Sequence, residues 1–245
     1  MSPPFFLPFV VPAKLTMQQL LAGAADRRQR ILAKIQRDAT RNKPELLEAV
    51  YNKTMKEVDD HVMGPPLSLP EVRERYGDFF NIVQRYGTEQ GVDDKGQIKY
   101  RCIDNHLDNA NNEAAERRQV VPMASVSHIL LMTRAMHAAL GPMQEDPEWE
   151  LRGATEDLKA AYRQCPLLSS QVAVAITAVW CPHGGPYCRG TVQFHEMYGQ
   201  PFGAGHAVPN SCRLAEWASR VTRRLLLLVL DHFFDDYFLV EPKCS

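Results

Sequence analysis

Between residues 16 and 77, apolar side chains recur every three or four positions, the spacing that places them on one face of a helix. Thr16 with Gln19, and Ser68 with Glu71, fit the capping box, in which two side chains satisfy backbone N–H groups at a helix N-terminus. Glycine and proline residues end each run of the pattern. The predicted helices span residues 16–40, 44–63 and 68–77.

After residue 78 the pattern changes to short runs of β-favouring residues separated by turn residues, which predicts strands and hairpins. Two apolar stretches that keep helical spacing interrupt these strands. The predicted hairpins combine residues 80–86 with 97–103, and residues 171–180 with 190–194. The predicted helices are residues 123–140 and 207–224, and short strands precede Asp157 and Asp235. Helices first and mixed elements later, without internal repeats, indicate an α+β fold.

Asp235 and Asp236 stand between two apolar segments, which predicts a tight hairpin with both acids at its tip. Side chains alternate across a strand, so two adjacent acids point the same way only where a turn relaxes the backbone. Adjacent aspartates are also ordinary turn residues, and the pair alone leaves both interpretations open.

Three short motifs occur in a defined order along the chain. Asp157 ends a predicted strand and Tyr162 follows it within the same segment. Residues 200–204 read Gln-Pro-Phe-Gly-Ala before a predicted helix, and residues 233–236 read Phe-Phe-Asp-Asp. In this order and spacing the motifs resemble the three catalytic motifs of reverse transcriptases: an acid followed by an aromatic residue, a Pro-x-Gly turn, and aromatic-x-Asp-Asp. The resemblance spans residues 79–240.

The resemblance implies an RNA-directed DNA polymerase, a nucleotidyltransferase of retrotransposon type that extends a primer 3′-hydroxyl. It assigns Asp157 and Asp235 as shared ligands of two Mg²⁺ ions, with Mn²⁺ as an alternative, and gives Asp236 a supporting role. Two such ions about 3.5 to 4 Å apart clamp the attacking and leaving oxygens, and they prefer oxygen ligands. We therefore expect carboxylates from separate strands to meet at one site.

The same resemblance places a group of residues around the incoming deoxynucleoside triphosphate. Residues 99–104 resemble the basic fingers segment, and which of its two basic residues faces the triphosphate stays open. The aromatic residue of the first motif would lie under the sugar and exclude a 2′-hydroxyl. The Phe-Gly pair of the second motif would let the backbone approach the nucleotide, because glycine has no side chain. The nucleotide-binding residues implied are Lys99, Arg101, Tyr162, Phe202 and Gly203.

The expected architecture is an α+β polymerase-type palm with an antiparallel sheet and packed helices, partial fingers and an N-terminal helical segment. We expect a disordered tail over residues 1–13, a helical segment over 14–77, and a fingers and palm domain over 78–245. This domain would be incomplete, because the family places a thumb after the Asp-Asp hairpin. The expected partners are an RNA or DNA template with its primer and deoxynucleoside triphosphates.

Composition narrows the function classes only slightly. The formal net charge of −1 gives no general attraction to nucleic acids. Seven basic residues nevertheless gather in a short segment. They are Arg27, Arg28, Arg30, Lys34, Arg37, Arg41 and Lys43. This segment is either a helix that faces the phosphates of a nucleic acid or a helix face exposed to solvent, and both interpretations stay open. We see no secretory leader and no apolar run long enough for a membrane span, and expect an intracellular protein, cytoplasmic or nuclear, with six reduced cysteines and no membrane partner.

Two other interpretations compete with an active polymerase. The first is a catalytically inactive or truncated polymerase fold that serves only as a nucleic-acid-binding or interaction module. The second, weaker one is a metal-dependent phosphodiesterase that uses the same acids. A zinc site built from Cys181, His183, Cys188 and His195 has a spacing that follows no common finger pattern. The oligomeric state stays open.

Overall fold

The computed structural model describes residues 7–120, 126–182, 190–226 and 228–243, and the chain divides into two compact units. Unit 1 comprises Met1–Phe9, Arg118–Ala161 and Val208–Ser245. Unit 2 comprises Val10–Arg117 and Tyr162–Ala207. Each unit is therefore discontinuous in sequence, and the predicted helical segment 14–77 lies wholly within unit 2.

The N-terminal part of unit 2 is helical, as the apolar spacing predicts. Both predicted capping boxes are formed, at Thr16 with Gln19 and at Ser68 with Glu71. Pro44 occupies the first turn of its helix, where the N–H group that proline lacks is not needed. The helices of this part are α1 (Met17–Ala22), α2 (Ala24–Arg41), α3 (Pro44–Asp59) and α4 (Leu69–Tyr76).

The first helix differs from the prediction, because it breaks at Gly23 into α1 and α2. Gly23 caps the end of α1 and the start of α2 with a φ of −90° and a ψ of 8°. Glycine is a poor helix former, and the apolar spacing continues on both sides of it, so the break leaves no trace in the pattern.

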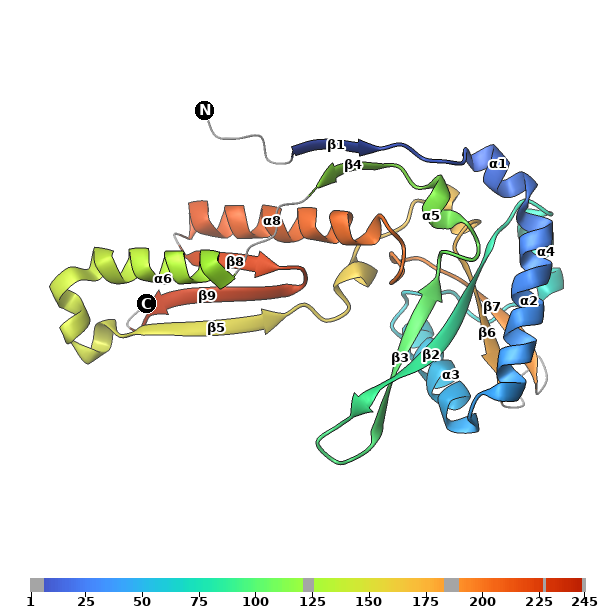
Figure 1. Cartoon of the computed structure of the whole chain (residues 1–245), viewed down its shortest axis with the longest axis horizontal. Coiled ribbons are helices and arrows are strands. Elements are labelled where there is room, and N and C mark those ends of the chain that lie inside the picture. The colour runs from blue at the N-terminus through green and yellow to red at the C-terminus, as the bar shows by residue number, and fades with distance from the viewer. Residues whose placement is uncertain (1–6, 121–125, 183–189, 227, 244–245) are drawn as a thin grey trace. The chain divides into compact units, whose positions relative to one another are not determined.

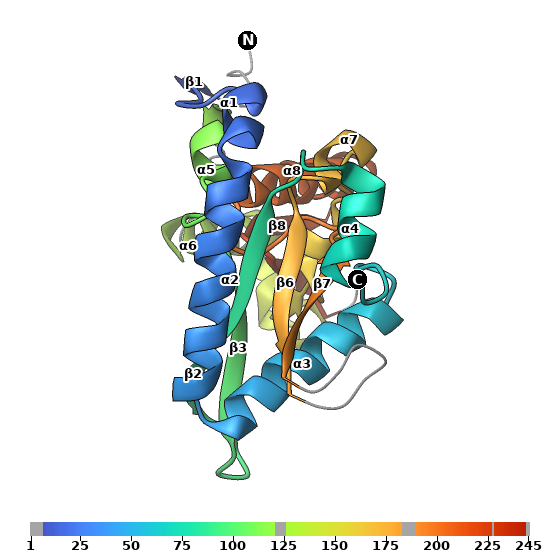
Figure 2. The ribbon, with the colours of Figure 1, turned by 90° about the vertical axis from the view of Figure 1, so that its right-hand side faces the viewer.

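A mixed four-stranded sheet forms the centre of unit 2, in the order β3-β2-β6-β7 (Figures 1 and 2). The outer pairs β2 with β3 and β6 with β7 are the two predicted hairpins, both antiparallel. The inner pair β2 and β6 is parallel and joins segments far apart in sequence. The bounds are β2 (Ile82–Val92), β3 (Ile98–Asn105), β6 (Ile176–Cys181) and β7 (Thr191–Glu196).

The strand predicted over residues 171–180 starts later than expected. Its first residues instead form the short helix α7 (Ser169–Val172), and β6 begins only at Ile176. The other short helix of unit 2 is α5 (Asn111–Ala114). Between β6 and β7, residues 183–189 lie outside the described residues, and with them His183 and Cys188 of the zinc alternative.

Helices cover both faces of this sheet. Ile31 and Ile35 of α2 pack with Ile82 and Ile176 in the main hydrophobic core, to which α4 adds Val72. Figure 2 shows α2 running along the sheet. The opposite face of β2 carries Arg85, whose guanidinium donates to Thr54 Oγ1 of α3. Thus α2 and α4 lie on one face and α3 on the other.

Unit 2 buries an ion-pair network on the α3 side of the sheet. Arg85 donates twice to Asp104, from Nε to Oδ1 at 2.8 Å and from Nη2 to Oδ2 at 3.2 Å. Arg163 Nη2 reaches Asp104 Oδ2 at 2.8 Å, and Glu57 Oε2 lies 2.9 Å from Arg85 and 3.3 Å from Arg163. Burial disfavours the charged Asp104 carboxylate, but Arg85 and Arg163 outweigh it and hold its pKa well below the usual range. Two carboxylates and two guanidinium groups thus neutralise each other.

Unit 1 contains an antiparallel three-stranded sheet in the order β5-β9-β8. The helix α8 packs on the face of this sheet that carries His232, whose Nδ1 lies 3.4 Å from Ser219 Oγ of α8. The bounds are β5 (Leu151–Asp157), β8 (Val229–Phe233), β9 (Asp236–Pro242), α6 (Val126–Leu140) and α8 (Ala207–Leu225), whose first residue belongs to unit 2. Within the predicted tail, Leu7–Val11 forms β1, which pairs with β4 (Arg117–Val120).

The predicted α+β class is confirmed, with helices packed on antiparallel and mixed sheets. The predicted helix 123–140 is described from Val126, since residues 121–125 lie outside the described ranges. Across the described helices, none combines the length and the apolar character needed to cross a lipid bilayer.

The buried network predicts a specific acid sensitivity. Because the folded pKa of Asp104 lies below its unfolded value, its stabilisation is complete above about pH 3.9 and is lost as the pH falls further. Replacing Asp104 by Asn leaves buried guanidinium charge unpaired and should lower the free energy of unfolding at pH 7 by about 3 to 5 kcal/mol. Urea denaturation between pH 7 and pH 2.5 measures both effects.

The control is Asp59→Asn, because Asp59 is exposed at the end of α3. This variant should stay within about 0.5 kcal/mol of the parent at every pH. The Asp104→Asn variant should show a flatter dependence below pH 4. Equal stability of the two variants at pH 7 would contradict the structural role of the network.

Candidate functional site

The tip of the β8–β9 hairpin carries two of the predicted acids. Phe233 pairs with Asp236, so the turn contains only Phe234 and Asp235. Phe234 has a φ of 56°, a left-handed conformation that glycine usually supplies in two-residue hairpins. Its ring packs edge-on against Phe233 at a centroid distance of 4.8 Å. The predicted hairpin with acids at its tip is confirmed, and it holds a bulky residue in a strained position.

The third acid lies on the strand next to this hairpin. In the β5–β9 register, Asp157 is directly opposite Asp236, so both side chains point to the same face of the sheet. The backbone N–H of Leu158 donates to the carbonyl oxygen of Asp235 at 3.1 Å, which ties the end of β5 to the hairpin turn. Residues far apart in sequence therefore bring three carboxyl groups to one end of one sheet.

This pairing of like charges costs stability unless a cation compensates it. Asp157 and Asp236 are exposed and Asp235 is half-buried. Among the described residues, no lysine, arginine or histidine forms an ion pair with any of the three. Their donor set consists of carboxylate oxygens, which suits Mg²⁺ or Mn²⁺. The strand register thus brings the backbones of the three acids together, but their carboxylate oxygens do not form a group within 4.8 Å of one another among the described residues, so their role as metal ligands stays a prediction.

Asp235 also influences a neighbouring thiol of unit 1. Burial, and then the charge of Asp235, raises the pKa of Cys212 in α8 to about 11. Such a thiol stays protonated at neutral pH and is a poor nucleophile. Together with its burial, this indicates a structural role for Cys212.

The predicted nucleotide-binding residues belong to unit 2. The structure brings Tyr162 and Phe202 together, with ring centroids 4.8 Å apart in an edge-to-face contact. The guanidinium of Arg163 lies 5.7 Å from the centre of the Phe202 ring. The aromatic residue of the first motif and the turn of the second therefore form one cluster.

Gly203 is packed against backbone, which explains why the turn needs glycine there. Its φ is +96°, and a Cβ at this position would lie 2.4 Å from the carbonyl oxygen of Asp104. Gly199 is equally confined, since a Cβ would lie 2.4 Å from the carbonyl oxygen of Arg163. The segment that carries Phe202 thus rests directly on the neighbouring chain.

The two basic residues of the fingers segment point the same way. Lys99 and Arg101 are exposed and alternate along β3 with Cys102 and the buried Asp104. Both cations therefore lie on one face of the strand, and Asp104 lies on the other. Because Lys99 and Arg101 share one face of β3, their orientation does not decide which of them would face the triphosphate. Asp104 lies on the opposite face of the strand.

Sequence reasoning missed Arg163, Arg85 and Glu57, the other members of the buried network. Arg163 stands beside Tyr162 in the first motif, and its guanidinium donates to the carbonyl oxygen of Gln200 at 3.4 Å as well as to Asp104. It therefore connects the segments of the first and second motifs to β3. The available signal was Arg85 close behind the apolar residues Ile82 and Val83 in the predicted strand, because a charge carried into the interior needs a buried partner.

A second group of possible metal ligands lies in unit 1. Glu216, Asp231 and His232 are buried and each offers one ligand atom within 4.8 Å of the others. Both carboxylates already have cationic partners, Arg220 at 2.5 Å from Glu216 and Arg223 at 3.3 Å from Asp231. A divalent cation would add charge to a neutral cluster, so we interpret this group as ion pairing that joins α8 to β8.

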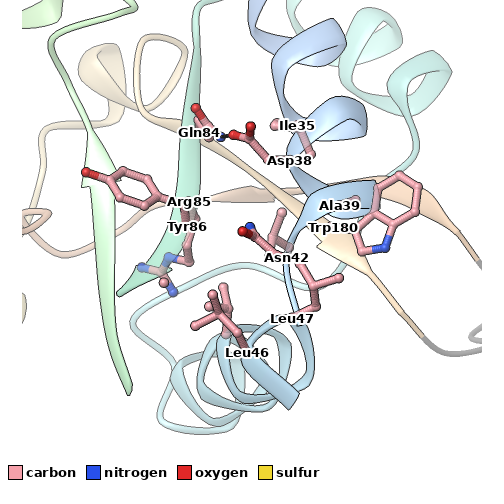
Figure 3. A pocket seen from close by; sticks show the side chains of 13 residues that line it. Ile35, Asp38, Ala39, Asn42, Leu46, Leu47, Gln84, Arg85, Tyr86 and Trp180 are labelled. Atoms are coloured by element: carbon pink, nitrogen blue, oxygen red, sulfur yellow. Dashed lines mark hydrogen bonds between the residues drawn. The ribbon is translucent and has the colours of Figure 1, made fainter. Parts of the chain in front are cut away.

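Two hollows of unit 2 contain none of the predicted nucleotide-binding residues. Figure 3 shows the first, where Asp38 and Asn42 of α2 approach Gln84 and Leu46. Its volume of about 30 Å³ has room for water but not for a nucleotide. The second, about 450 Å³, lies between the end of α3 and Tyr198 and is wide open to solvent.

No protein-family model and no curated protein matches this chain.

The close packing around Gly203 predicts a large effect of a single methyl group. Gly203→Ala should lower the free energy of unfolding by about 2 to 4 kcal/mol, because it combines a left-handed φ with a backbone clash. Chemical denaturation followed by circular dichroism measures the loss. The matched control is Gly153→Ala in β5, where the nearest atom to a Cβ is 4.0 Å away. A change larger for Gly153→Ala than for Gly203→Ala would refute this packing.

Proposed function

We propose that this chain carries the catalytic palm of a reverse-transcriptase-like polymerase, with Asp157, Asp235 and Asp236 as its metal-binding carboxylates. The observation that carries the proposal is the pairing of Asp157 with Asp236 across β5 and β9, beside the turn that holds Asp235. Two strands distant in sequence converge on one acidic end of a sheet. No cation among the described side chains balances that charge.

The acids suit nucleotidyl transfer better than general acid–base work. All three are carboxylates with oxygen donors, and two of them are exposed on one face of a sheet. When bound, a pair of Mg²⁺ ions would supply neutralisation of the charge that develops on the transferred phosphoryl group. Asp157 and Asp235 would hold these ions, and Asp236 would support them from the opposite strand position. The register of β5 and β9 and the bond from Leu158 N–H to the Asp235 carbonyl oxygen support this assignment, because they bring the backbones of the acids together.

The residues of unit 2 supply the second part of the proposal. The Tyr162 and Phe202 rings lie edge to face and would form an apolar wall beside the sugar, and Gly203 lets the turn that carries Phe202 rest on the backbone of Asp104. Lys99 and Arg101 offer two exposed cations on one face of β3 for a triphosphate. We assign these five residues to the deoxynucleotide, and an RNA or DNA template with its primer to the polymerase as a whole.

Primer extension on an RNA template, with Mg²⁺ or Mn²⁺, tests the catalytic assignment. Asp157→Asn and Asp235→Asn should each reduce incorporation of deoxynucleotides by at least about 100-fold, because each removes a ligand of the metal ions that would neutralise the charge developing in the transition state. The control is Glu156→Gln, which removes the neighbouring charge on the other face of β5 and should retain activity. Chelation by EDTA should abolish extension, and added Mg²⁺ should restore it.

Two results would redirect the interpretation. Metal-dependent strand cleavage without added nucleotides would favour a phosphodiesterase that uses the same acids. Binding of a primer–template duplex that ignores both Mg²⁺ and the Asp157→Asn change, with no extension, would favour a non-catalytic nucleic-acid-binding module. Extension that survives Asp235→Asn would overturn the assignment of the acids.

A further variant tests the aromatic wall. Tyr162→Ala should reduce the preference for deoxynucleotides over ribonucleotides by about 10- to 100-fold, because the space for a 2′-hydroxyl opens. Tyr162→Phe keeps the ring and should keep the preference. The ratio of kcat/KM values for the two nucleotides measures it, and equal ratios for the alanine and phenylalanine variants would remove Tyr162 from the sugar site.

A further inference from the structure

Basic side chains of α2 gather along one edge of the helix. Their positions recur every three or four residues, the spacing of a single helical stripe. The core-facing stripe of the same helix contains Ile31 and Ile35. The remaining solvent-facing positions include Ala33 and Gln36, which carry no charge. The basic stripe consists of Arg27, Arg30, Lys34, Arg37 and Arg41.

Two members of the stripe already have partners within unit 2. Lys34 Nζ forms an ion pair with Asp108 Oδ2 at 2.6 Å. Arg27 donates to the carbonyl oxygen of Leu20 and feels the charge of Glu113. Acidic residues in α5 and just before it therefore offset the charges of Arg27 and Lys34, and these two residues stabilise unit 2.

The other three members of the stripe have no charged partner among the described residues. Arg30, Arg37 and Arg41 are exposed, and the guanidinium groups of all three lack ion pairs and hydrogen bonds with any described residue. At about 1.5 Å per residue, the stripe from Arg30 to Arg41 is roughly 16 Å long. This equals the axial length of about five phosphates along one strand of a duplex, at roughly 3.4 Å each.

The chemistry of the stripe selects the kind of partner. A guanidinium group binds a phosphate through two parallel hydrogen bonds and stays charged at every accessible pH. A helix that binds a membrane surface needs an exposed apolar face, but Ile31 and Ile35 of α2 are buried against the sheet. The rigid row of cations on a helix whose own apolar face is buried therefore fits a polyanionic strand better than a lipid surface.

A second basic surface lies on the same side of the sheet. Gln84 of β2 hydrogen-bonds Asp38 of α2 and stands opposite Asn105 in β3. Lys99 and Arg101 share the face of Asn105 by strand alternation, so they point to the side that α2 covers. Cations from a helix and from a hairpin thus face one side of unit 2.

We propose that Arg30, Arg37 and Arg41 bind the phosphodiester backbone of a nucleic-acid strand without reading its bases. The contact is electrostatic, depends on salt, and requires neither the three acids nor catalysis. It resolves the two interpretations of the basic segment in favour of a phosphate-facing helix for these three positions. The proposal stands independently of the polymerase assignment, which uses the three acids of unit 1 and other side chains of unit 2.

Fluorescence anisotropy with a labelled 20-nucleotide single strand tests the proposal on the full chain. The variant replaces Arg30, Arg37 and Arg41 together by Gln. The charge-matched control replaces three exposed lysines of unit 2, Lys53, Lys56 and Lys95, by Gln. Because all six residues are exposed, both variants should keep the parental Tm, and thermal unfolding verifies this.

The expected result is a change in the salt dependence of binding. Each lost phosphate contact lowers the slope of log K against log salt by about 0.7, so the arginine variant should lose about two units of slope and at least tenfold in affinity at low salt. The lysine control should match the parent. RNA and DNA arms of the assay separate the two sources of phosphodiester, and measurement in EDTA without nucleotides, where the contact should persist, separates this proposal from the catalytic one.

Three outcomes would overturn the proposal. They are equal loss in the arginine variant and the lysine control, parental binding by the arginine variant, and binding of polyglutamate or anionic phospholipid vesicles as tightly as the nucleic acid. The last would assign the stripe to an acidic protein or a membrane surface.

Discussion

The buried carboxylate of Asp104 organises unit 2. A charge in the interior persists only when partners satisfy it, and here Arg85 and Arg163 approach it from a different strand and from the segment after β5. Because Arg163 also reaches the carbonyl oxygen of Gln200, a single electrostatic centre fixes β2, β3 and the turn that carries Phe202. Geometry around the aromatic cluster is therefore set by charge neutralisation rather than by apolar packing alone.

The acidic end of unit 1 follows the opposite principle. Asp157 and Asp236 face each other in the exposed register of two strands, an arrangement that reduces sheet stability. The adjoining turn adds a second cost, since Phe234 adopts a left-handed conformation where glycine would be relaxed. A like-charge pair and a strained backbone conformation thus occur together in one hairpin. Such combinations are typical of functional sites, because they reduce the stability of the fold and selection for folding alone would not retain them.

The sequence predicted the features that depend on residues close together in the chain. Capping boxes at Thr16 and Ser68, the two hairpins of unit 2 and the acid-tipped hairpin follow from short-range rules, and the structure contains all of them. The sequence did not predict features that depend on contacts between distant segments. Neither the parallel pairing of β2 with β6 nor the ion pairs of Arg163 has a periodic signature, because they join segments that only folding brings together. The break at Gly23 was missed because the apolar spacing continues across it.

The parallel β2–β6 pair has a consequence for biogenesis. Strand β6 begins at Ile176, so α2 and α4 remain without a completed sheet until that strand and its partner β7 have left the ribosome. Such long-range closure makes folding slow, and it leaves apolar helix faces uncovered while most of the chain is still being synthesised. Within unit 2, α2 and α4 are therefore the elements that wait longest for the strands on which they pack.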